Sequence, residues 1–170
     1  MVIRMQENAL QIPEVCTALA QVLIAKKLSI ASAESCTGGL ISAACTDLPG
    51  SSLWFERGFV TYSNAAKSDL LGVPASLIQT HGAVSEEVAR AMAQGALEHS
   101  LADWSVAVTG IAGPTGGSAA KPVGSVWLAW ACKSNGWSET QLQLFAGDRK
   151  AVREATTALA VSRLLALLKA

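Results

Sequence analysis

Residues 34–39, with the sequence ESCTGG, place two hydroxyls and a thiol side by side behind a carboxylate and ahead of two glycines. A hydroxyl or a thiol can act as a nucleophile when a neighbouring base or a lowered pKa activates it. The same hydroxyls can instead cap a helix, because Ser and Thr accept hydrogen bonds from its first free N–H groups. Ser35 and Thr37 therefore have two interpretations, capping and catalysis, and Cys36 at a helix start is a rival nucleophile. Glu34 can be a partner of the N-terminus of that helix, which the helix dipole favours.

The choice between Ser35 and Cys36 as nucleophile depends on which base is available to activate it. A catalytic thiol usually pairs with His, and this chain has only two, His81 and His99. A Ser hydroxyl can use a Lys base when burial lowers the pKa of that Lys. Lys67 lies one turn into an expected helix that follows a strand, so Ser35 with Lys67 is a better candidate pair than Cys36 with His. The alternative interpretation of Lys67 is an exposed helix lysine.

Two further polar stretches and one arginine occupy positions where they could bind a ligand. Residues 62–67, YSNAAK, join an expected strand to a helix, and residues 109–117, TGIAGPTGG, follow another expected strand. These glycines can let the backbone approach an anion or can merely form a connection, and their spacing is not that of a P-loop or a dinucleotide fold. Arg149 lies in the first turn of the last expected helix, where the helix dipole disfavours a cation. It can clamp a carboxylate or phosphate, or pair at the surface with Asp148 or Glu154.

The helices and strands that hold these residues can be predicted from the sequence. Apolar residues at helical spacing predict helices, and short apolar runs between turn residues predict strands. Expected helices are 14–27, 37–46, 63–71, 85–100 and 148–170, expected strands are 28–33, 55–62, 104–109, 123–132 and 140–145, residues 72–74 and 80–82 are expected turns, and Asn135-Gly136 predicts a type I′ hairpin. This order predicts a single α/β domain with three layers, α/β/α, around a mixed β-sheet. The three polar stretches then follow strand ends, where such sheets bind ligands.

The composition bounds the class of protein. Of the 170 residues, 51% are hydrophobic and 15% are charged, which excludes a disordered chain. The 13 basic and 13 acidic side chains leave no net charge, so we expect no nucleic-acid partner. There is no apolar run of about 18 residues and no signal-peptide pattern over 1–9, which predicts a cytoplasmic protein with no membrane partner. The low charge also leaves apolar surface for a subunit interface.

Four cysteines, Cys16, Cys36, Cys45 and Cys132, are far apart and show no C-x-x-C spacing. With only two histidines beside them, we expect neither a metal site nor a disulfide framework. Three of the four are expected to be small buried hydrophobic residues.

Six blocks of the sequence resemble the CinA C-terminal domain family. They are AESCTGG, GSSLWFERGFVTYSNAAK, GAVSEEVA, VTGIAGPTGG, KPVGSVWLA and GDRKAVR, in the family's order, and the resemblance runs from Val15 to the C-terminus. The resemblance implies one three-layer α/β/α domain over residues 1–170, present as a homodimer. It implies hydrolysis of the amide of nicotinamide mononucleotide (NMN) to nicotinic acid mononucleotide and ammonia, in pyridine-nucleotide recycling. It implies no metal and no organic cofactor.

The resemblance also implies roles for single residues. Ser35 is the expected nucleophile, Lys67 the expected general base, and Tyr62 a catalytic residue of the same pocket. Backbone N–H groups at the start of the following helix are the expected oxyanion hole. The expected substrate-binding residues are Glu34, Cys36, Thr37, Gly38, Gly39, Thr109, Gly110, Ile111, Ala112, Gly113 and Arg149. The competing hypothesis is a catalytically silent nucleotide-binding or sensing module of the same fold, which would be expected to have lost Ser35 or Lys67.

Overall fold

A five-stranded mixed β-sheet organises the chain, with the strand order β2-β1-β3-β4-β5. The computed structural model describes residues 11–170, so the prediction about a signal peptide over 1–9 lies outside the described residues. The strands are β1 (Ile30–Glu34), β2 (Phe55–Val60), β3 (Trp104–Gly110), β4 (Ser125–Cys132) and β5 (Ser138–Leu144). The helices are α1 (Ile12–Lys26), α2 (Leu40–Thr46), α3 (Asn64–Leu71), α4 (Ala75–His81), α5 (Glu86–Glu98) and α6 (Arg149–Lys169), with a short 3-10 helix η1 (Ser51–Leu53) after α2.

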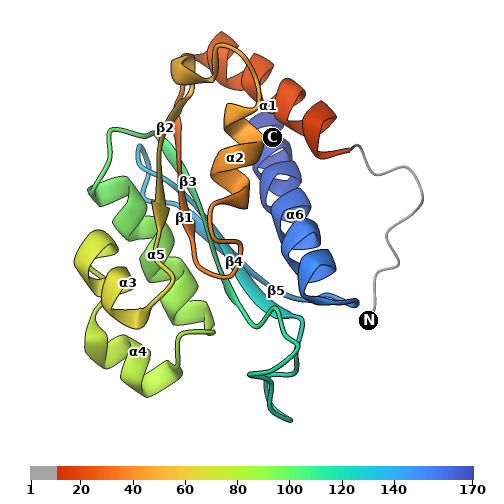
Figure 1. The fold of residues 1–170 in the computed structure, drawn as a ribbon. Helices are drawn as coiled ribbons and strands as arrows, with labels where there is room; N and C mark the ends of the chain where they lie inside the picture. The colour runs from red at the N-terminus through yellow and green to blue at the C-terminus, as the bar shows by residue number, and fades with distance from the viewer. Residues whose placement is uncertain (1–10) are drawn as a thin grey trace.

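The direction of the strands brings the polar stretches together. Strand β1 pairs in parallel with both β2 and β3, whereas β3 with β4 and β4 with β5 are antiparallel. The carboxyl ends of β1, β2 and β3 therefore lie at one edge of the sheet, the lower edge in Figure 1. Residues 34–39, 62–67 and 109–117 begin within two residues of these three ends, so one end of the sheet gathers all three stretches.

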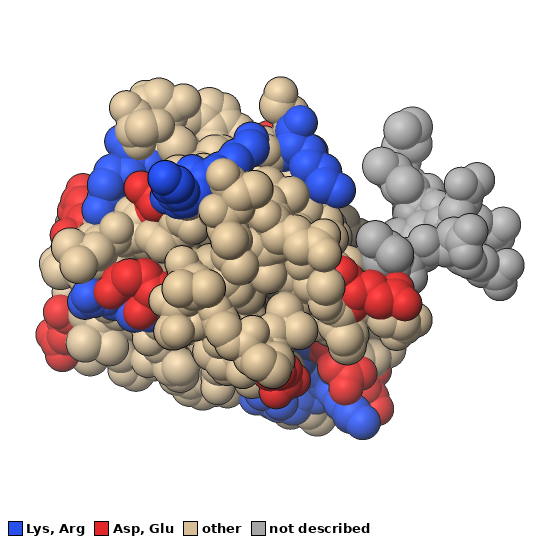
Figure 2. Space-filling model, turned by 90° about the horizontal axis from the view of Figure 1, so that it is seen from above, with Lys and Arg blue, Asp and Glu red and all other residues tan. Residues whose placement is uncertain are grey.

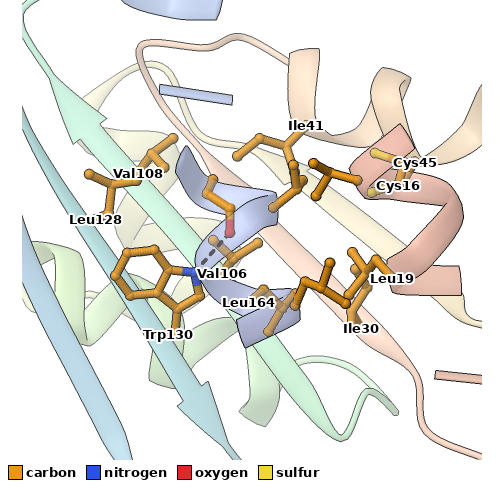
Figure 3. Close-up of a cluster of buried hydrophobic side chains, with 14 of the residues drawn as sticks. Cys16, Leu19, Ile30, Ile41, Cys45, Val106, Val108, Leu128, Trp130 and Leu164 are labelled. Carbon is orange, nitrogen blue, oxygen red and sulfur yellow. Dashed lines mark hydrogen bonds between the residues drawn. The ribbon is translucent and has the colours of Figure 1, made fainter. Parts of the chain in front are cut away.

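Helices cover both faces of the sheet, which confirms the predicted three-layer α/β/α arrangement. Helices α1, α2 and α6 lie on one face and α3, α4 and α5 on the other (Figure 1). The core of the first face surrounds Trp130, whose indole N–H donates to Ala160 O at 3.0 Å (Figure 3). Cys16 and Cys45 are buried in the same core and are free thiols, as expected of small hydrophobic residues. The second face is rich in alanine, which lets α5 lie close to the sheet.

Two helices differ from the sequence prediction. Helix α2 begins at Leu40, three residues later than predicted, because Gly38 and Gly39 have φ of +59° and +109°. This left-handed backbone cannot continue an α-helix, and glycine adopts it without steric cost. Helix α4 occupies residues 75–81, where the sequence indicated turns on either side and no helix between them. Pro74, in the expected turn 72–74, is the N-cap of α4. Proline is tolerated at the start of a helix, so a new helix begins directly after it.

Strands β4 and β5 form the predicted antiparallel hairpin, but the predicted type I′ turn is wrong. That turn requires positive φ at both central residues. Gly136 has φ of +66°, whereas Asn135 does not have a positive φ. Asn135 Oδ1 instead accepts the N–H of Trp137 at 3.0 Å, so a side-chain hydrogen bond closes the turn.

The surface carries charges of both signs. Figure 2 shows the end of the molecule opposite the carboxyl ends of β1, β2 and β3, where basic and acidic side chains lie around a largely uncharged centre. Among residues 11–170, no helix is both long enough and apolar enough to cross a membrane.

Candidate active site

Ser35 follows the last residue of β1, between β2 and β3. Its backbone N–H donates to Val108 O of β3 at 3.1 Å, which extends the β1–β3 pairing beyond the end of β1. Gly38 and Gly39 then turn the chain into α2. These bonds hold Ser35 at the carboxyl edge of the sheet, with 8% of its surface exposed.

Lys67 reaches the same place from α3. Ser63 caps this helix, because its Oγ accepts the N–H of Ala66 at 3.0 Å. One turn further on, the Lys67 side chain enters the protein and is only 1% exposed. Its Nζ donates to Ser35 Oγ at 3.1 Å and to Thr61 O at 3.0 Å. Lys67 is therefore not a surface helix lysine, and a side chain 32 residues away in sequence contacts the Ser35 hydroxyl.

The surroundings of Lys67 make its amine easier to deprotonate than that of an exposed lysine. Burial lowers the pKa of the Lys67 amine from its usual value of 10.5, and the nearby Cys36 thiol opposes this shift. An amine that loses its proton readily can accept a proton from a hydroxyl in contact with it. Ser35 and Lys67 thus have the contact and the electrostatics of a hydroxyl activated by an amine.

The Cys36 thiol is in the opposite situation. Burial raises its pKa to about 11, and the Glu34 charge adds to the rise. The backbone N–H of Cys36 itself and the charges of Arg153 and Lys67 oppose it. A thiol with this pKa is protonated near neutral pH, and the thiolate is the nucleophilic form. The environment of Cys36 therefore disfavours it as the nucleophile.

Neither histidine serves as a base for this thiol. His81 ends α4, and its Nδ1 lies 3.3 Å from Glu87 Oε1. His99 follows α5, and its Nδ1 lies 2.9 Å from Gly95 O. Both rings are thus engaged away from Cys36, and no Cys–His pair is formed.

Glu34, which the sequence assigned to substrate binding, lies behind the site. It has no exposed surface. Its two carboxylate oxygens accept six hydrogen bonds, from the side chains of Ser32, Thr37 and Ser42 and from the backbone N–H groups of Gly39, Ile41 and Ser42. The carboxylate therefore caps α2 and holds the 35–39 loop in shape. We reassign Glu34 from substrate contact to support of the loop.

Glu34→Gln is expected to destabilise the protein by about 1–3 kcal/mol, measured by urea unfolding. A Gln amide has one acceptor oxygen and one donor nitrogen. If the nitrogen replaces Oε1 it faces the N–H of Ser42, and if it replaces Oε2 it faces the N–H groups of Gly39 and Ile41. Either orientation leaves at least one buried N–H without an acceptor, which costs about 1–3 kcal/mol.

The control for this prediction is Glu87→Gln. Glu87 is partly exposed and pairs only weakly with His81, at 3.3 Å. Such a surface change is expected to stay within about 0.5 kcal/mol of the wild type. Equal stability of Glu34→Gln and Glu87→Gln would contradict the supporting role of Glu34.

Arg149 joins two of the polar stretches. Its Nη2 donates to Tyr62 Oη at 3.0 Å and its Nη1 donates to Gly113 O at 2.9 Å. Asp148 does not pair with it, since Asp148 Oδ1 accepts the N–H of Ala151 at 2.9 Å as the N-cap of α6. Arg149 thus connects the start of α6 with the 62–67 and 109–117 stretches, and the surface-pair interpretation does not apply.

A cavity of about 230 Å³ opens at this edge of the sheet. Its walls come from the segments that follow β1, β2 and β3, from the α4–α5 turn and from the start of α6. The lining residues are Ser35, Cys36, Tyr62, Asn64, Lys67, Ala83, Val84, Thr109, Gly110, Ala112 and Arg149. Among residues 11–170, no three His, Cys, Asp or Glu side chains are grouped so that they could hold a metal ion.

The cavity separates the predicted residues into two groups. Eight of them line it, namely Ser35, Cys36, Tyr62, Lys67, Thr109, Gly110, Ala112 and Arg149. The wall does not include Glu34, Thr37, Gly38, Gly39, Ile111 and Gly113. Sequence reasoning missed Asn64, Ala83 and Val84, although the first lies in the YSNAAK stretch and the other two in the GAVSEEVA block. Thr109 connects these parts, because its hydroxyl donates to Ala83 O at 2.8 Å.

The backbone donors beside Ser35 are fewer than the sequence suggested. The N–H of Gly38 donates to Ser35 O at 3.1 Å, and the N–H of Gly39 donates to Glu34 Oε2 at 3.1 Å. The N–H groups of Cys36 and Thr37 have no hydrogen-bond acceptor in any other residue of the range 11–170. Of the four expected donors, only these two have no acceptor in another residue of that range.

Comparison with known proteins shows the family of this chain. The chain is 56% identical over 140 residues to nicotinamide-nucleotide amidohydrolase PncC of Enterobacter agglomerans, which covers 82% of this chain and 85% of that protein. It is 52% identical over 156 residues to the protein of the same name from Pseudomonas putida, covering 92% and 96%. The crystal structure of competence/damage inducible protein CihA from Agrobacterium tumefaciens superposes with a TM-score of 0.90 at 44% identity, covering 98% of this chain and 100% of that one. Residues 13–168 match the model of the CinA C-terminal domain, and the chain belongs to that family.

Proposed function

We propose that this protein hydrolyses the carboxamide of NMN to nicotinic acid mononucleotide and ammonia, with Ser35 as nucleophile and Lys67 as general base. The observation that carries the proposal is the 3.1 Å contact between Lys67 Nζ and Ser35 Oγ in the wall of the cavity. The substrate is inferred from relatives of this chain, which are named nicotinamide-nucleotide amidohydrolases. A carboxamide is a weak electrophile, so its hydrolysis requires an activated nucleophile of this kind.

In the first step, neutral Lys67 accepts the proton of Ser35, and Ser35 Oγ forms a bond to the amide carbon. The carbonyl electron pair moves to oxygen and gives a tetrahedral oxyanion. The N–H groups of Cys36 and Thr37 are the donors proposed for that oxygen, and one such donor contributes about 3–4 kcal/mol in known enzymes. Burial of the Lys67 amine supports this step, because it lowers the pKa of the base.

In the second step, the carbon–nitrogen bond breaks and the leaving nitrogen takes a proton from Lys67, which releases ammonia and leaves an ester on Ser35. Lys67 then accepts a proton from water, and the hydroxide attacks the ester. Ser35 Oγ leaves with the proton from Lys67, and nicotinic acid mononucleotide is freed. Tyr62 lines the same cavity and is a second donor for the leaving nitrogen.

The substrate phosphate is proposed to lie at Arg149. A second cavity of about 460 Å³ adjoins the first, and both are lined by Ala112 and Arg149. Its wall also contains Asp148, Lys150 and Arg153. Lys150 is the second cation proposed for the phosphate, because the Arg153 guanidinium donates to the carbonyls of Cys36 and Thr37. A guanidinium binds phosphate strongly through charge-assisted hydrogen bonds. The carboxamide would then lie in the first cavity at Ser35, with the ribose between them.

The test of this function is ammonia release from NMN by the purified protein. Nicotinamide and glutamine serve as comparison substrates, since a general small-amide hydrolase would cleave them equally well. A melting scan with NMN distinguishes the competing hypothesis, a silent binding module, which would be stabilised by NMN without turnover. The absence of ammonia from NMN under conditions where the protein is folded would exclude the proposed function.

Arg149→Ala is expected to raise KM for NMN by about 10- to 100-fold and to change kcat by less than about threefold. A charge-assisted hydrogen bond contributes about 1.5–3 kcal/mol, and binding of the remote phosphate acts on ground state and transition state alike. The control substrate is nicotinamide riboside, which lacks the phosphate. The variant and the wild type should cleave it at similar rates, and an unchanged KM for NMN would argue against the phosphate contact.

The homodimer that the sequence suggested stays a prediction, because the structure describes a single chain. Several large apolar side chains are exposed on the two edge strands, including Val60 of β2 and Leu142 and Leu144 of β5. Such residues are available for contact with a second copy.

A further inference from the structure

Arg153 makes an unusual contact with the nucleophile loop. It lies one turn after Arg149 on α6. Its Nε donates to Cys36 O at 3.1 Å and its Nη2 donates to Thr37 O at 2.9 Å. Among residues 11–170 it forms no ion pair with a carboxylate. A cation on the last helix is therefore held by two successive backbone carbonyls directly after Ser35.

This contact constrains the opposite side of the loop. In a trans peptide the C=O and the N–H of one unit point in opposite directions. The carbonyl of Cys36 and the N–H of Thr37 belong to one peptide unit. The carbonyl of Ser35 and the N–H of Cys36 belong to the preceding unit. Arg153 bonds the first carbonyl, and the Gly38 N–H bonds the second at 3.1 Å. Both units are thus fixed through their oxygens, while their N–H groups have no acceptor in another residue of the described range.

A bond from a cation also changes the strength of these donors. Hydrogen bonding to the carbonyl polarises the peptide unit, which makes the N–H of that unit a better donor. The positive charge lies close enough to favour a negative charge at Cys36, since Arg153 acts to lower the pKa of that thiol against the larger effect of burial. The same field favours negative charge that develops beside Ser35 during a reaction.

We propose that Arg153 is a positioning residue that aligns and polarises the oxyanion hole formed by the N–H groups of Cys36 and Thr37. The inference rests on the proposed acyl transfer through Ser35. Arg153 does not line the cavity that contains Ser35 and Lys67, so it acts through the backbone and not on the reacting atoms. It should therefore affect the transition state and leave ground-state binding of the amide unchanged.

The experiment compares Arg153→Met with the wild type. We expect kcat for NMN to fall by about 30- to 100-fold, and KM to change by less than about threefold. The second readout is inhibition by an NMN analogue that carries a boronic acid in place of the carboxamide. Its tetrahedral adduct with Ser35 places an oxygen in the oxyanion hole, so its inhibition constant should rise by the same factor as kcat falls. Binding of nicotinic acid mononucleotide, which forms no adduct, should not change.

Two further variants test whether Arg153 aligns the N–H groups of the oxyanion hole or only stabilises the fold of the loop. Arg153→Lys keeps the charge and one donor, and an intermediate loss of about 3- to 10-fold is expected. It also serves as the test if Arg153→Met does not fold. Arg153→Ala leaves space for free guanidinium, which should restore part of kcat at concentrations that do not unfold the protein.

The matched control is Arg163→Met on the same helix. Arg163 also makes two side-chain hydrogen bonds, to Glu139 at 2.7 and 2.8 Å, but lies ten residues further from the loop. It should leave kcat and boronate inhibition unchanged. The positioning role is overturned if Arg153→Met and Arg153→Lys keep wild-type kcat and boronate affinity. It is also overturned if they lose substrate and boronate binding equally and guanidinium does not rescue them. If the wild type itself releases no ammonia from NMN, it is the proposed function that fails, and the inference fails with it.

Discussion

Ser35→Ala is expected to lower kcat for NMN deamidation by at least about 1,000-fold, whereas Cys36→Ala should retain activity within about fivefold of the wild type. The two side chains are adjacent and both line the cavity, so the pair isolates the identity of the nucleophile. Ser35 contacts the Lys67 amine at 3.1 Å. Burial raises the pKa of the Cys36 thiol to about 11, so the thiol stays protonated near neutral pH.

The measurement is ammonia release under saturating NMN, with the melting temperature of each variant as a control for folding. Mass spectrometry of the protein quenched during turnover should find the acyl group on the peptide that contains Ser35, and no such adduct in Ser35→Ala. Loss of activity in Cys36→Ala together with its retention in Ser35→Ala would move the nucleophile to the thiol.

Lys67→Met is expected to reduce kcat by a similar factor, about 1,000-fold or more, because it removes the base and keeps the length of the side chain. In the wild type, kcat/KM should rise with pH as Lys67 loses its proton and should level off above its pKa in the folded protein. Burial places that pKa below 10.5. The rising limb should therefore end below the usual lysine range, and Lys67→Met should lose it. A wild-type profile that is flat from about pH 5 to 10 would contradict the general-base role.

The same substitution has an opposite effect on stability. Because the pKa of Lys67 is lower in the folded than in the unfolded protein, the unfolded state binds more protons between the two pKa values. Wild-type stability from this group thus rises with pH through that window and is complete above about 10.5. We expect Lys67→Met to unfold at higher urea concentration than the wild type near pH 6, and the difference to shrink toward pH 10. An increase of this difference with pH would contradict the sign of the shift.

Much of this site follows from local sequence. Scarce histidine and the position of both residues after expected strands make Ser35 with Lys67 the better pair, and the family resemblance supplies their roles as nucleophile and base. The parallel arrangement of β1, β2 and β3 then brings the two segments together, as strand ends in such sheets do. The position of Arg149 in the first turn of α6 made it a candidate, since a cation there opposes the helix dipole. A residue that violates a local structural preference is therefore a candidate for a functional role.

Other parts depend on contacts that no local pattern describes. The sequence left two interpretations for Glu34, a partner of the following helix N-terminus and, through the family resemblance, a substrate contact. In the structure its oxygens face α2 and accept six hydrogen bonds, three of them from backbone N–H groups. The direction of a carboxylate at a strand end depends on which donors the next helix presents, and that helix begins three residues later than its apolar pattern predicts.

The sequence by itself determined the fold class, the edge of the sheet where chemistry can occur, and the residue types available there. It did so because strand and helix periodicity, turn residues and dipole preferences are short-range properties of the chain. Only the tertiary structure decided which side chains face the cavity, that Lys67 is buried, and that Arg153 holds the loop after Ser35 from a distance of more than 100 residues in sequence. Burial, shifted pKa values and hydrogen bonds between distant segments arise when separate elements pack together, and packing is a property of the whole domain.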